Sequence, residues 1–348
     1  MKNFKIFSLA FVSILSFLFT FPVYAEELPK LKTAWLGEHE KFIVWYAQKN
    51  GWDKDFGFEL EILNFDSGKS IVDGIKAYDW AVAGMGAVPA LTGYFNNEIK
   101  IIAIANNESN SNILYARKDS PILQQKGYNP DYPQMYGSPE TVKKARILCT
   151  KGSSAHYLLN SWLTALNLTE KDVKIQFMEM TPAFGAFKGG LGDIVGVWSP
   201  FSLEAEKMGY QAVATGGTCK VFQPVLIVVN AKYAEKNSDM VRAFLKMYMQ
   251  GIEMIRTKPL EDIAPLYQAF FKEVLSLDIT LEEALFDLRN HPVFTLDEQK
   301  VMFEDTDQNS VIYSWLKEII EFYNNNTNAA EQAEQINALD SSWINSLQ

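Results

Sequence analysis

Short apolar segments alternate with amphipathic ones along the first third of the chain. Residues 58–65 place apolar side chains between Glu59, Glu61 and Asn64, which is the period of a half-buried strand. Residues 40–50 indicate a helix that ends near Gly51. Strands are predicted over 31–36, 58–65, 80–85, 100–105 and 113–117, and helices over 40–50, 70–78 and 87–95. This order predicts a mainly parallel sheet covered by helices.

The same pattern restarts after an irregular stretch. Residues 119–140 are rich in Pro, Gly, Tyr and Gln and indicate a linker or excursion. Strands are then predicted over 146–150, 173–178, 194–198 and 211–215, and helices over 154–166, 182–188 and 202–208. A strongly apolar strand follows over 224–230, and helices are predicted over 239–256, 260–276, 281–290, 297–303 and 310–324, with a last helix in the polar tail.

Two α/β units in one chain predict a bilobed α/β molecule with a helical C-terminal tail. Lobe 1 would comprise residues 26–118 plus 222–348, and lobe 2 residues 119–221. The crossings near Lys118–Pro121 and Lys220–Pro224 would form a hinge. Because open α/β sheets bind ligands beyond the carboxyl ends of their strands, the natural site is the cleft between the lobes.

The N-terminal segment has the features of a cleaved leader. Lys2 and Lys5 precede an apolar run from Ile6 to Phe21, and Val23-Tyr24-Ala25 supplies small residues for cleavage. The alternative is a membrane anchor, but the run is shorter than the roughly 20 residues that a spanning helix needs. Residues 1–25 are therefore predicted to be a signal peptide, which implies export to the periplasm.

Composition narrows the class of protein. Apolar residues make up 48% and charged residues 21%, as in a packed globular chain. The net charge of −10, without a basic run, argues against nucleic acid as a partner. Two cysteines exclude a disulfide scaffold and a four-thiolate zinc site. Cys149 and Cys219 could form one disulfide or remain two buried free thiols.

Polar residues and glycines gather where the predicted strands end. In the first unit, Glu38 and His39 follow one strand, and residues 84–89 form a glycine-rich turn into a helix, where backbone N–H groups favour an anion. In the second unit, Ser153 and Ser154 open a helix, and Trp198 ends a strand where it could wall a pocket. Each feature also has a plain structural reading as a turn, a cap or a core side chain.

Five stretches in order resemble the taurine, aliphatic sulfonate and nitrate binding proteins of bacterial ABC importers. They are Asn64-Phe65-Asp66-Ser67-Gly68-x-Ser70-Ile71-Val72, Gly84-Met85-Gly86-Ala87-Val88-Pro89, Ser153-Ser154-Ala155-His156-Tyr157-x-Leu159, Val197-Trp198-Ser199-Pro200 and Phe294-Thr295-Leu296-Asp297-Glu298-Gln299. The resemblance implies a type II periplasmic-binding-protein fold, ligand capture by lobe closure, and delivery to a membrane permease. We also expect a monomer that needs no cofactor and no bound metal.

The departures from that family bear on the ligand. Ala87 and Val88 stand where sulfonate binders often carry hydroxyl residues, and Asn112 stands where taurine binders have an acidic residue. Glu38, Glu40 and Glu108 lie near the predicted cleft mouth, and a buried carboxylate needs a cationic partner. The hypothesis is a small ligand with an amine, whose anionic end would sit on the helix N-termini at Ala87 and Ser154; the alternative is that these glutamates are solvated.

The predicted ligand-binding residues combine both arguments. They are Trp35, Glu38, His39, Asp66, Met85, Gly86, Ala87, Asn107, Glu108, Asn112, Ser153, Ser154, His156 and Trp198. The leading function is a periplasmic solute-binding protein for a taurine-like, sulfonate-like or other amine-bearing compound, with an amine- or amino-acid-specific binder as the alternative.

Other classes of function remain open at this point. No Ser-His-Asp order, nucleophile elbow or HExxH motif is present, so an enzyme is not expected. The resembled fold also includes a pyrimidine synthase of thiamine biosynthesis, but its Cys-rich segment is missing. His39 between two glutamates suggests a metal site, yet adjacent helix residues do not face one another. A ligand-sensing module of a receptor is the third class.

Overall fold

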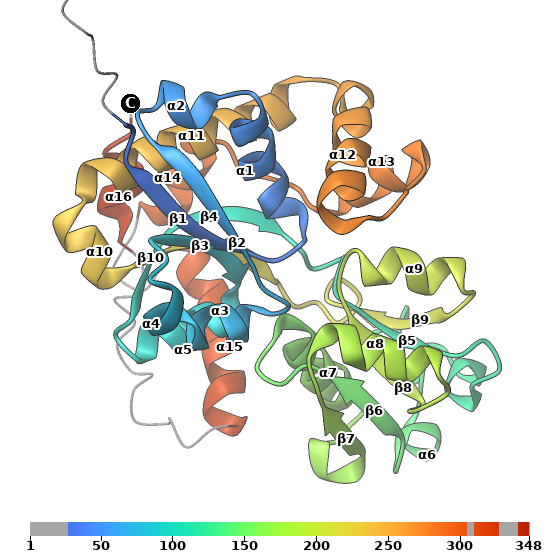
Figure 1. Ribbon diagram of the computed structural model, residues 1–348. Coiled ribbons are helices and arrows are strands. Elements are labelled where there is room, and N and C mark those ends of the chain that lie inside the picture. Colours follow the sequence, from blue (N-terminus) through green and yellow to red (C-terminus); the bar gives the residue numbers. More distant parts are fainter. Residues whose placement is uncertain (1–26, 305–309, 327–339, 348) are drawn as a thin grey trace, which may run out of the picture.

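The computed structural model describes residues 27–304, 310–326 and 340–347. The predicted signal peptide therefore lies outside the described residues. The chain forms two lobes, each built on its own sheet with helices on both faces (Figure 1). No helix in the described ranges combines the length and the apolar character needed to cross a bilayer.

Lobe 1 contains a five-stranded mixed sheet in the order β2-β1-β3-β10-β4. The strands are β1 (Lys30–Trp35), β2 (Glu59–Asn64), β3 (Val82–Gly86), β4 (Ile99–Asn107) and β10 (Pro224–Asn230). The first three are parallel, as predicted, whereas β10 runs antiparallel to both β3 and β4. All seven residues of β10 are buried, which explains its continuous apolar sequence.

Helices cover both faces of this sheet. They are α1 (His39–Lys49), α2 (Trp52–Asp55), α3 (Gly68–Asp73), α4 (Ile75–Tyr78), α5 (Ala87–Phe95), α10 (Ala231–Lys236), α11 (Ser238–Thr257), α12 (Leu260–Leu275), α13 (Leu281–Asn290), α14 (Leu296–Phe303) and α16 (Ser341–Asn345). The helix predicted over 70–78 is two helices that meet at Gly74, and α10 was not predicted. Buried aromatic side chains fill the face under α11 and α12, where the Trp35 ring stacks on Tyr248.

Lobe 2 contains the second mixed sheet, in the order β7-β6-β8-β5-β9. The strands are β5 (Ile113–Ala116), β6 (Arg146–Cys149), β7 (Lys174–Phe177), β8 (Ile194–Val197) and β9 (Gln211–Thr215). They are covered by α6 (Pro139–Val142), α7 (Ser154–Ala165), α8 (Met180–Lys188) and α9 (Phe201–Lys207), with short 3-10 turns η1 (Pro121–Gln124) and η2 (Glu170–Asp172).

The first crossing between the lobes differs from the prediction. Strand β5 pairs antiparallel with β8 and β9 of the second sheet, so the chain changes sheets between Asn107 and Ile113. The crossing was expected at Lys118–Pro121, after strand β5, but it comes before that strand. The sequence did not reveal this, because an apolar strand has the same pattern in either sheet. The second crossing, over residues 216–223, agrees with the hinge expected at Lys220–Pro224.

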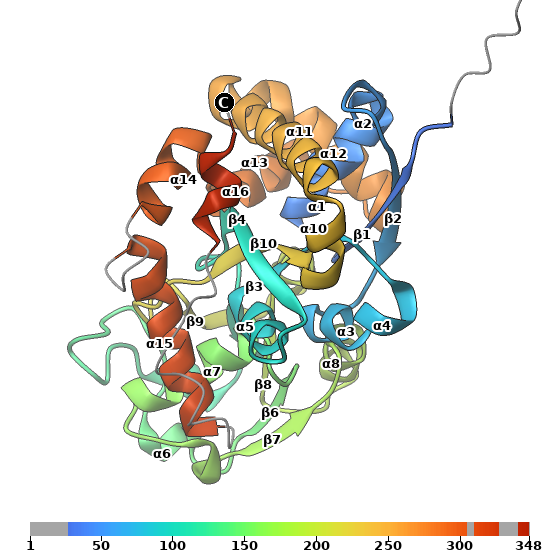
Figure 2. The same cartoon turned by 90° about the vertical axis from the view of Figure 1, so that its left-hand side faces the viewer.

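The C-terminal tail does not belong to one lobe only. Helix α15 (Val311–Asn326) runs from lobe 1 down along lobe 2 (Figure 2). It packs against α5 of lobe 1 and α7 of lobe 2. Its Trp315 ring stacks on Phe222 of the second crossing, with ring centroids 3.6 Å apart. Residues 222–348 were predicted to lie in lobe 1, so α15 is a correction to that division.

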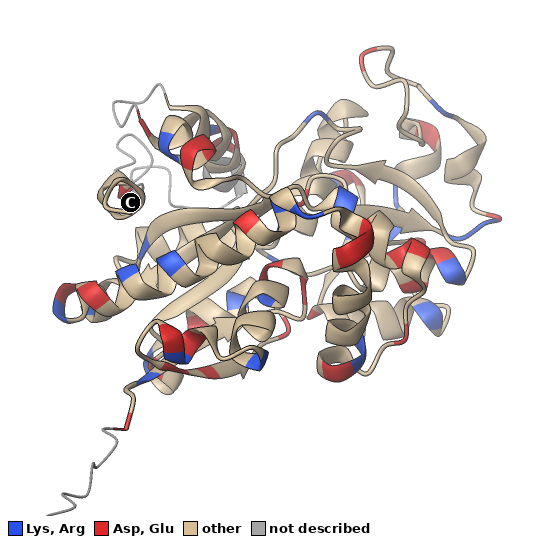
Figure 3. Cartoon of the chain, turned by 90° about the horizontal axis from the view of Figure 1, so that it is seen from above, with Lys and Arg blue, Asp and Glu red and all other residues tan. Residues whose placement is uncertain are grey.

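Two further sequence expectations have clear outcomes. The irregular stretch 119–140 packs on lobe 2, where the Tyr136 amide donates to Val213 O and the Asn129 side chain donates to Ala165 O. Cys149 and Cys219 are both free and buried, which is the second of the two alternatives. Acidic and basic residues are interspersed on the helices in Figure 3, in keeping with the absence of a basic run from the sequence.

Candidate functional site

The two crossings are hydrogen-bonded to each other at the base of the interlobe cleft. The Glu108 amide donates to Gln223 O at 2.9 Å, and the Gln223 amide donates to Ser109 Oγ at 2.9 Å. The Gln223 side chain also donates to Ser154 O at 2.8 Å. The hinge is thereby tied to the N-terminus of α7 in lobe 2.

Three further contacts join the lobes. Ser154 Oγ donates to Glu108 Oε1 at 2.6 Å, and Thr181 Oγ1 donates to Asp66 Oδ1 at 2.6 Å. Lys207 on α9 forms an ion pair with Glu283 on α13 at 3.0 Å. In Figure 1, α9 of lobe 2 lies below α12 and α13 of lobe 1. The structure is therefore a closed arrangement of the two lobes.

An inner cavity of about 20 Å³ lies between the closed lobes. It is lined by residues from strand ends and helix starts of both sheets: Leu36, Glu38, Glu40, Gly68, Gly86, Pro89, Glu108, Asn112, Ser153, Ser154 and Trp198. Of the fourteen predicted site residues, this cavity brings together Glu38, Gly86, Glu108, Asn112, Ser153, Ser154 and Trp198. Its volume suits one water-sized group.

Three carboxylates dominate the inner cavity, and all three are buried. Glu38, Glu40 and Glu108 are 5%, 1% and 4% exposed. Burial raises the pKa of Glu40 to about 8, and burial together with the neighbouring carboxylates raises the pKa of Glu38 well above its ordinary value. Burial also raises the pKa of Glu108. The empty cavity therefore favours the protonated form of these carboxyl groups, and a cation that entered it would favour their ionised form.

The unpartnered polar atoms of this cavity include three hydrogen-bond acceptors. Both carboxylate oxygens of Glu40 have no partner among the described residues. The Asn112 amide nitrogen donates to Glu108 O, which leaves Asn112 Oδ1 free to accept. A ligand group with several N–H donors and a positive charge would satisfy these atoms.

The helix N-termini that were expected to hold an anion face one of the chain's own carboxylates. Gly86 directly precedes α5, and Ser154 begins α7. A Cβ atom at position 86 would collide with the Ser154 hydroxyl and lie 3.0 Å from Glu108 Oε1. Glycine at position 86 therefore lets Glu108 reach both helix starts, where the favourable position for negative charge is already filled.

A larger space of about 320 Å³ adjoins the inner cavity and is called the outer chamber below. It shares Leu36, Glu38 and Trp198 with the inner cavity and is otherwise lined by Gly37, Lys41, Asn64, Phe65, Asp66, Thr181, Ser199, Pro200, Phe201, Glu204, Val274, Leu275 and Leu277. Its walls combine apolar side chains with a buried lysine. Asp66 lines this chamber and accepts from Thr181, whereas the cap of α3 is Ser67 and not Asp66.

Several predicted site residues do not line either cavity. Trp35 and Met85 are fully buried in lobe 1. His39 is also buried, and its ring stacks on His291 with centroids 5.0 Å apart. Asn107 Oδ1 accepts from the amide and hydroxyl of Ser109 in the first crossing. Ala87 is the first residue of α5 and is 2% exposed.

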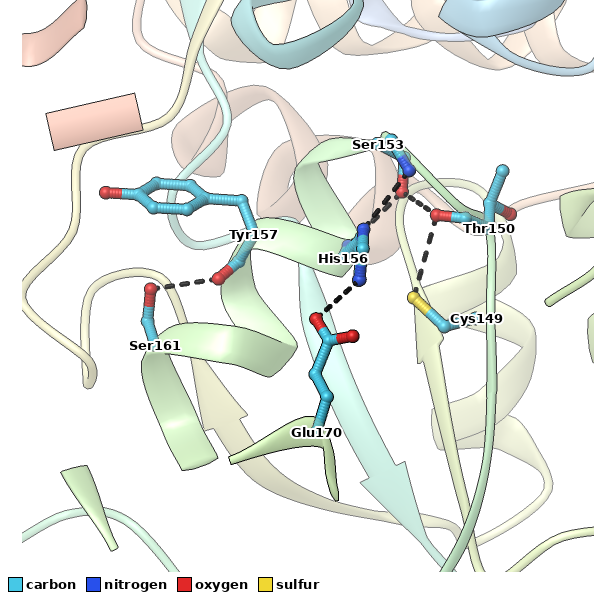
Figure 4. A network of polar contacts seen from close by, with 8 residues as sticks. Cys149, Thr150, Ser153, His156, Tyr157, Ser161 and Glu170 are labelled. Carbon is cyan, nitrogen blue, oxygen red and sulfur yellow. Dashed lines mark hydrogen bonds and ion pairs between the residues drawn. The ribbon is translucent and has the colours of Figure 1, made fainter. Parts of the chain in front are cut away.

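His156 lines neither the inner cavity nor the outer chamber. It lies at the start of α7, between Ser153 and Glu170 (Figure 4). Its Nε2 lies 2.9 Å from Glu170 Oε1, and the Gly152 amide donates to its Nδ1 at 3.2 Å. The Ser153 hydroxyl accepts from the His156 amide and donates to Thr150 O. These bonds fix the turn that presents Ser154 to Glu108.

Sequence reasoning missed Lys41, Thr181 and Ser199. Lys41 lies in the first turn of α1, three residues after the N-cap residue Glu38, and its closeness to that predicted site residue could have revealed it. Thr181 and Ser199 come from lobe 2 and line the chamber together with residues of lobe 1. No local pattern in the sequence marks them.

The sequence also matches known proteins. The sequence profile of the NMT1-like family matches residues 25–263. An ABC transporter periplasmic binding protein of Brachyspira hyodysenteriae is 26% identical over 255 residues, which is 73% of each chain. The taurine-binding periplasmic protein of Escherichia coli is 26% identical over 200 residues, covering 57% of this chain and 58% of that protein.

Solved structures share the fold at low sequence identity. The periplasmic aliphatic sulphonate binding protein of Escherichia coli superposes with a TM-score of 0.64 at 16% identity, covering 86% of this chain and 93% of that one. A ligand-binding component of an ABC-type import system from Staphylococcus aureus gives a TM-score of 0.68 at 11% identity, covering 92% and 99%. These matches establish a periplasmic-binding-protein fold.

Proposed function

This chain belongs to the NMT1-like family, and we propose that it is the substrate-binding component of an ABC importer for a ligand with a protonated nitrogen. Its named relatives are periplasmic binding proteins and not enzymes. By analogy, the chain would act in the periplasm as a monomer, without cofactor, and deliver its ligand to a membrane permease. The predicted signal peptide agrees with that location.

The proposed class of ligand rests on the hydrogen-bond acceptors that line the inner cavity. The carboxyl groups of Glu38, Glu40 and Glu108 line a free space of about 20 Å³. Neither carboxyl oxygen of Glu40 has a hydrogen-bond partner among the described residues. Burying such groups without a cation is costly, and pairing them with a hydrogen-bonded cation offsets that cost. An ammonium group supplies both the charge and the donors.

Binding would couple to closure of the lobes. Lobe 1 supplies Glu38 and Glu40, and the hinge supplies Glu108. The nitrogen would therefore bind to lobe 1 and the hinge first. Lobe 2 would then add Ser154 and Trp198 and exclude water, which strengthens the polar contacts. A permease that recognises the closed form would respond to this shift in population. No covalent step is needed.

A sulfonate or other anion is the second candidate, because of what the relatives are named to bind. One relative is named as a taurine-binding protein and another as an aliphatic sulfonates-binding protein. The latter, from Bacillus subtilis, is 24% identical over 227 residues, which is 64% of each chain. The helix starts at Gly86 and Ser154 would favour an anion. Glu108 opposes that assignment, because its carboxylate already occupies this position.

Taurine and its two truncated analogues separate the candidates. Binding of taurine, ethylamine and ethanesulfonate is compared by thermal shift, alongside nitrate, amino acids and diamines. A ligand at about 100 times its dissociation constant adds about 2.7 kcal/mol of stability. Stabilisation by compounds with an amine, and none by ethanesulfonate or nitrate, would support the proposal. Stabilisation by ethanesulfonate equal to that by taurine would overturn it.

A further inference from the structure

The inner cavity is too small for a whole organic ligand. Its volume of about 20 Å³ holds one group the size of water or ammonium. Leu36, Glu38 and Trp198 line both this cavity and the outer chamber of about 320 Å³. A ligand whose nitrogen occupies the inner cavity must therefore place the rest of its atoms in the outer chamber.

The outer chamber contains a buried cation that lacks an anion. Lys41 is 3% exposed, and its ammonium donates to Asn64 Oδ1. Among the described residues, no carboxylate forms an ion pair with it. Burial lowers the pKa of Lys41 to about 8, and the neighbouring Glu40, whose own pKa burial raises to about 8, offsets this only in part. A buried ammonium in this position needs a negative partner.

A second polar group faces the same chamber without a partner. The Ser199 hydroxyl is 1% exposed and has no hydrogen-bond partner among the described residues. Phe65, Phe201 and Leu275 lie among the apolar residues of the walls. The chamber thus offers a cation, a free hydroxyl and an apolar surface, and each suits a different part of one ligand.

We propose that the outer chamber binds the anionic end of a zwitterionic ligand at Lys41 and Ser199, while the apolar walls hold the spacer. This assignment rests on the proposed function, since it takes the nitrogen to lie among the glutamates. The sequence suggested that the anionic end of the ligand binds at the helix N-termini at Ala87 and Ser154. The present assignment places it at Lys41 and Ser199 instead, because the Glu108 carboxyl group already contacts Ser154. The ligand class is an amino acid or aminosulfonate with an extended spacer.

Matched pairs of compounds test the assignment on the unmodified protein. Each zwitterion is compared with the amine that lacks its anionic group: taurine with ethylamine, 6-aminohexanoate with pentylamine, and 4-(aminomethyl)benzoate with benzylamine. Calorimetric titration of the protein purified after export gives the affinities. At least one extended zwitterion is expected to bind ten times or more tightly than its partner amine, because only the zwitterion neutralises Lys41.

A charge-removing variant locates the contact. Lys41→Met should reduce the affinity for that zwitterion at least tenfold and should not reduce the affinity for its partner amine. The matched control is Lys49→Met, on the same helix but exposed and paired with Glu273, which should alter neither affinity. A thermal melt of each variant confirms that it is folded.

The outcomes separate this inference from the function on which it rests. Failure of every amine and zwitterion to bind the unmodified protein would overturn the proposed function. Equal binding of each zwitterion and its partner amine by the unmodified protein would overturn the outer-chamber assignment alone. An unchanged zwitterion affinity in folded Lys41→Met would also overturn it.

Discussion

The Glu108 carboxylate accepts a hydrogen bond of 2.6 Å from the Ser154 hydroxyl across the boundary between the two lobes. Glu108 follows the last strand of the first sheet before the chain crosses, and Ser154 begins the first long helix of lobe 2. A buried carboxylate therefore takes the place at this helix start that a ligand anion would otherwise occupy. This contact connects closure of the cleft to the proposed preference for a cation.

The buried carboxylates make stability depend on pH. The pKa of Glu40 is about 8 in the folded chain and near 4.5 when unperturbed, so the folded state binds more protons between these values. The free energy of unfolding should therefore fall as pH rises from about 5 to 8, by a total on the order of a few kcal/mol. Urea unfolding at several pH values measures this slope.

Glu40→Gln should flatten that slope by removing the titrating group. Its unliganded form should be more stable than the unmodified protein at pH 8, where the latter carries a buried charge. Glu61→Gln, on β2, is the matched control and should leave the slope unchanged. Parallel pH profiles of Glu40→Gln and the unmodified protein would contradict the assigned pKa.

Gly86→Ala should prevent closure without unfolding lobe 1. The added methyl group would collide with the Ser154 hydroxyl, which comes from lobe 2, and would lie 3.0 Å from Glu108 Oε1 of the hinge. Ligand affinity should fall at least tenfold, and small-angle scattering in the presence of ligand should show a more extended particle.

Gly185→Ala is the control for that substitution. Gly185 lies in helix α8, and a Cβ atom there would meet nothing within 4 Å. It should bind ligand as the unmodified protein does. A Gly86→Ala protein that closes and binds normally would show that the contact between Gly86 and Ser154 does not limit closure.

The contact between Asp66 and Thr181 should act on the rate of opening. Thr181 Oγ1 donates to Asp66 Oδ1 at 2.6 Å between the lobes, near the surface. A hydrogen bond of this kind contributes about 0.5–1.5 kcal/mol. Thr181→Val should therefore accelerate ligand release by up to about tenfold in stopped-flow measurements, with little effect on the melting temperature of the ligand-free protein. A large drop in that melting temperature would assign the bond to fold stability instead.

Both cysteines should be inert thiols in the native protein. They are buried and free, and burial raises the pKa of Cys219 to about 12 and that of Cys149 still further. A thiol reagent should label neither residue in the folded protein and both after denaturation without reductant. If neither cysteine is labelled after denaturation until a reductant is added, the two form a disulfide instead.

Local sequence patterns predicted much of the fold because strands and caps are local features. Residues 87–95 and 224–230 form the predicted helix and strand with unchanged bounds. The crossing at Glu108–Asn112 was misplaced because the burial of Ile113–Ala116 does not identify its sheet. Pairing between distant strands decides that point, and a single sequence does not record it.

The candidate site was predictable only in part, for a related reason. Glu38, Glu108 and Ser154 were found because they stand at strand ends and helix starts. His39 stands next to Glu38 and Met85 next to Gly86, but both side chains are buried in lobe 1 and line neither cavity. Lys41 was overlooked because a lysine on an amphipathic helix is ordinarily exposed, whereas this one is 3% exposed.

Proton release on binding tests the central claim most directly. If a protonated nitrogen enters among Glu38, Glu40 and Glu108, it stabilises their ionised forms, so carboxyl groups with raised pKa values lose protons as it binds. Calorimetry with the tightest-binding amine at pH 7, in phosphate and in Tris, measures this release. The account predicts net release of protons and an affinity that increases up to about pH 8. No proton exchange, or net uptake, would contradict a cation-binding site.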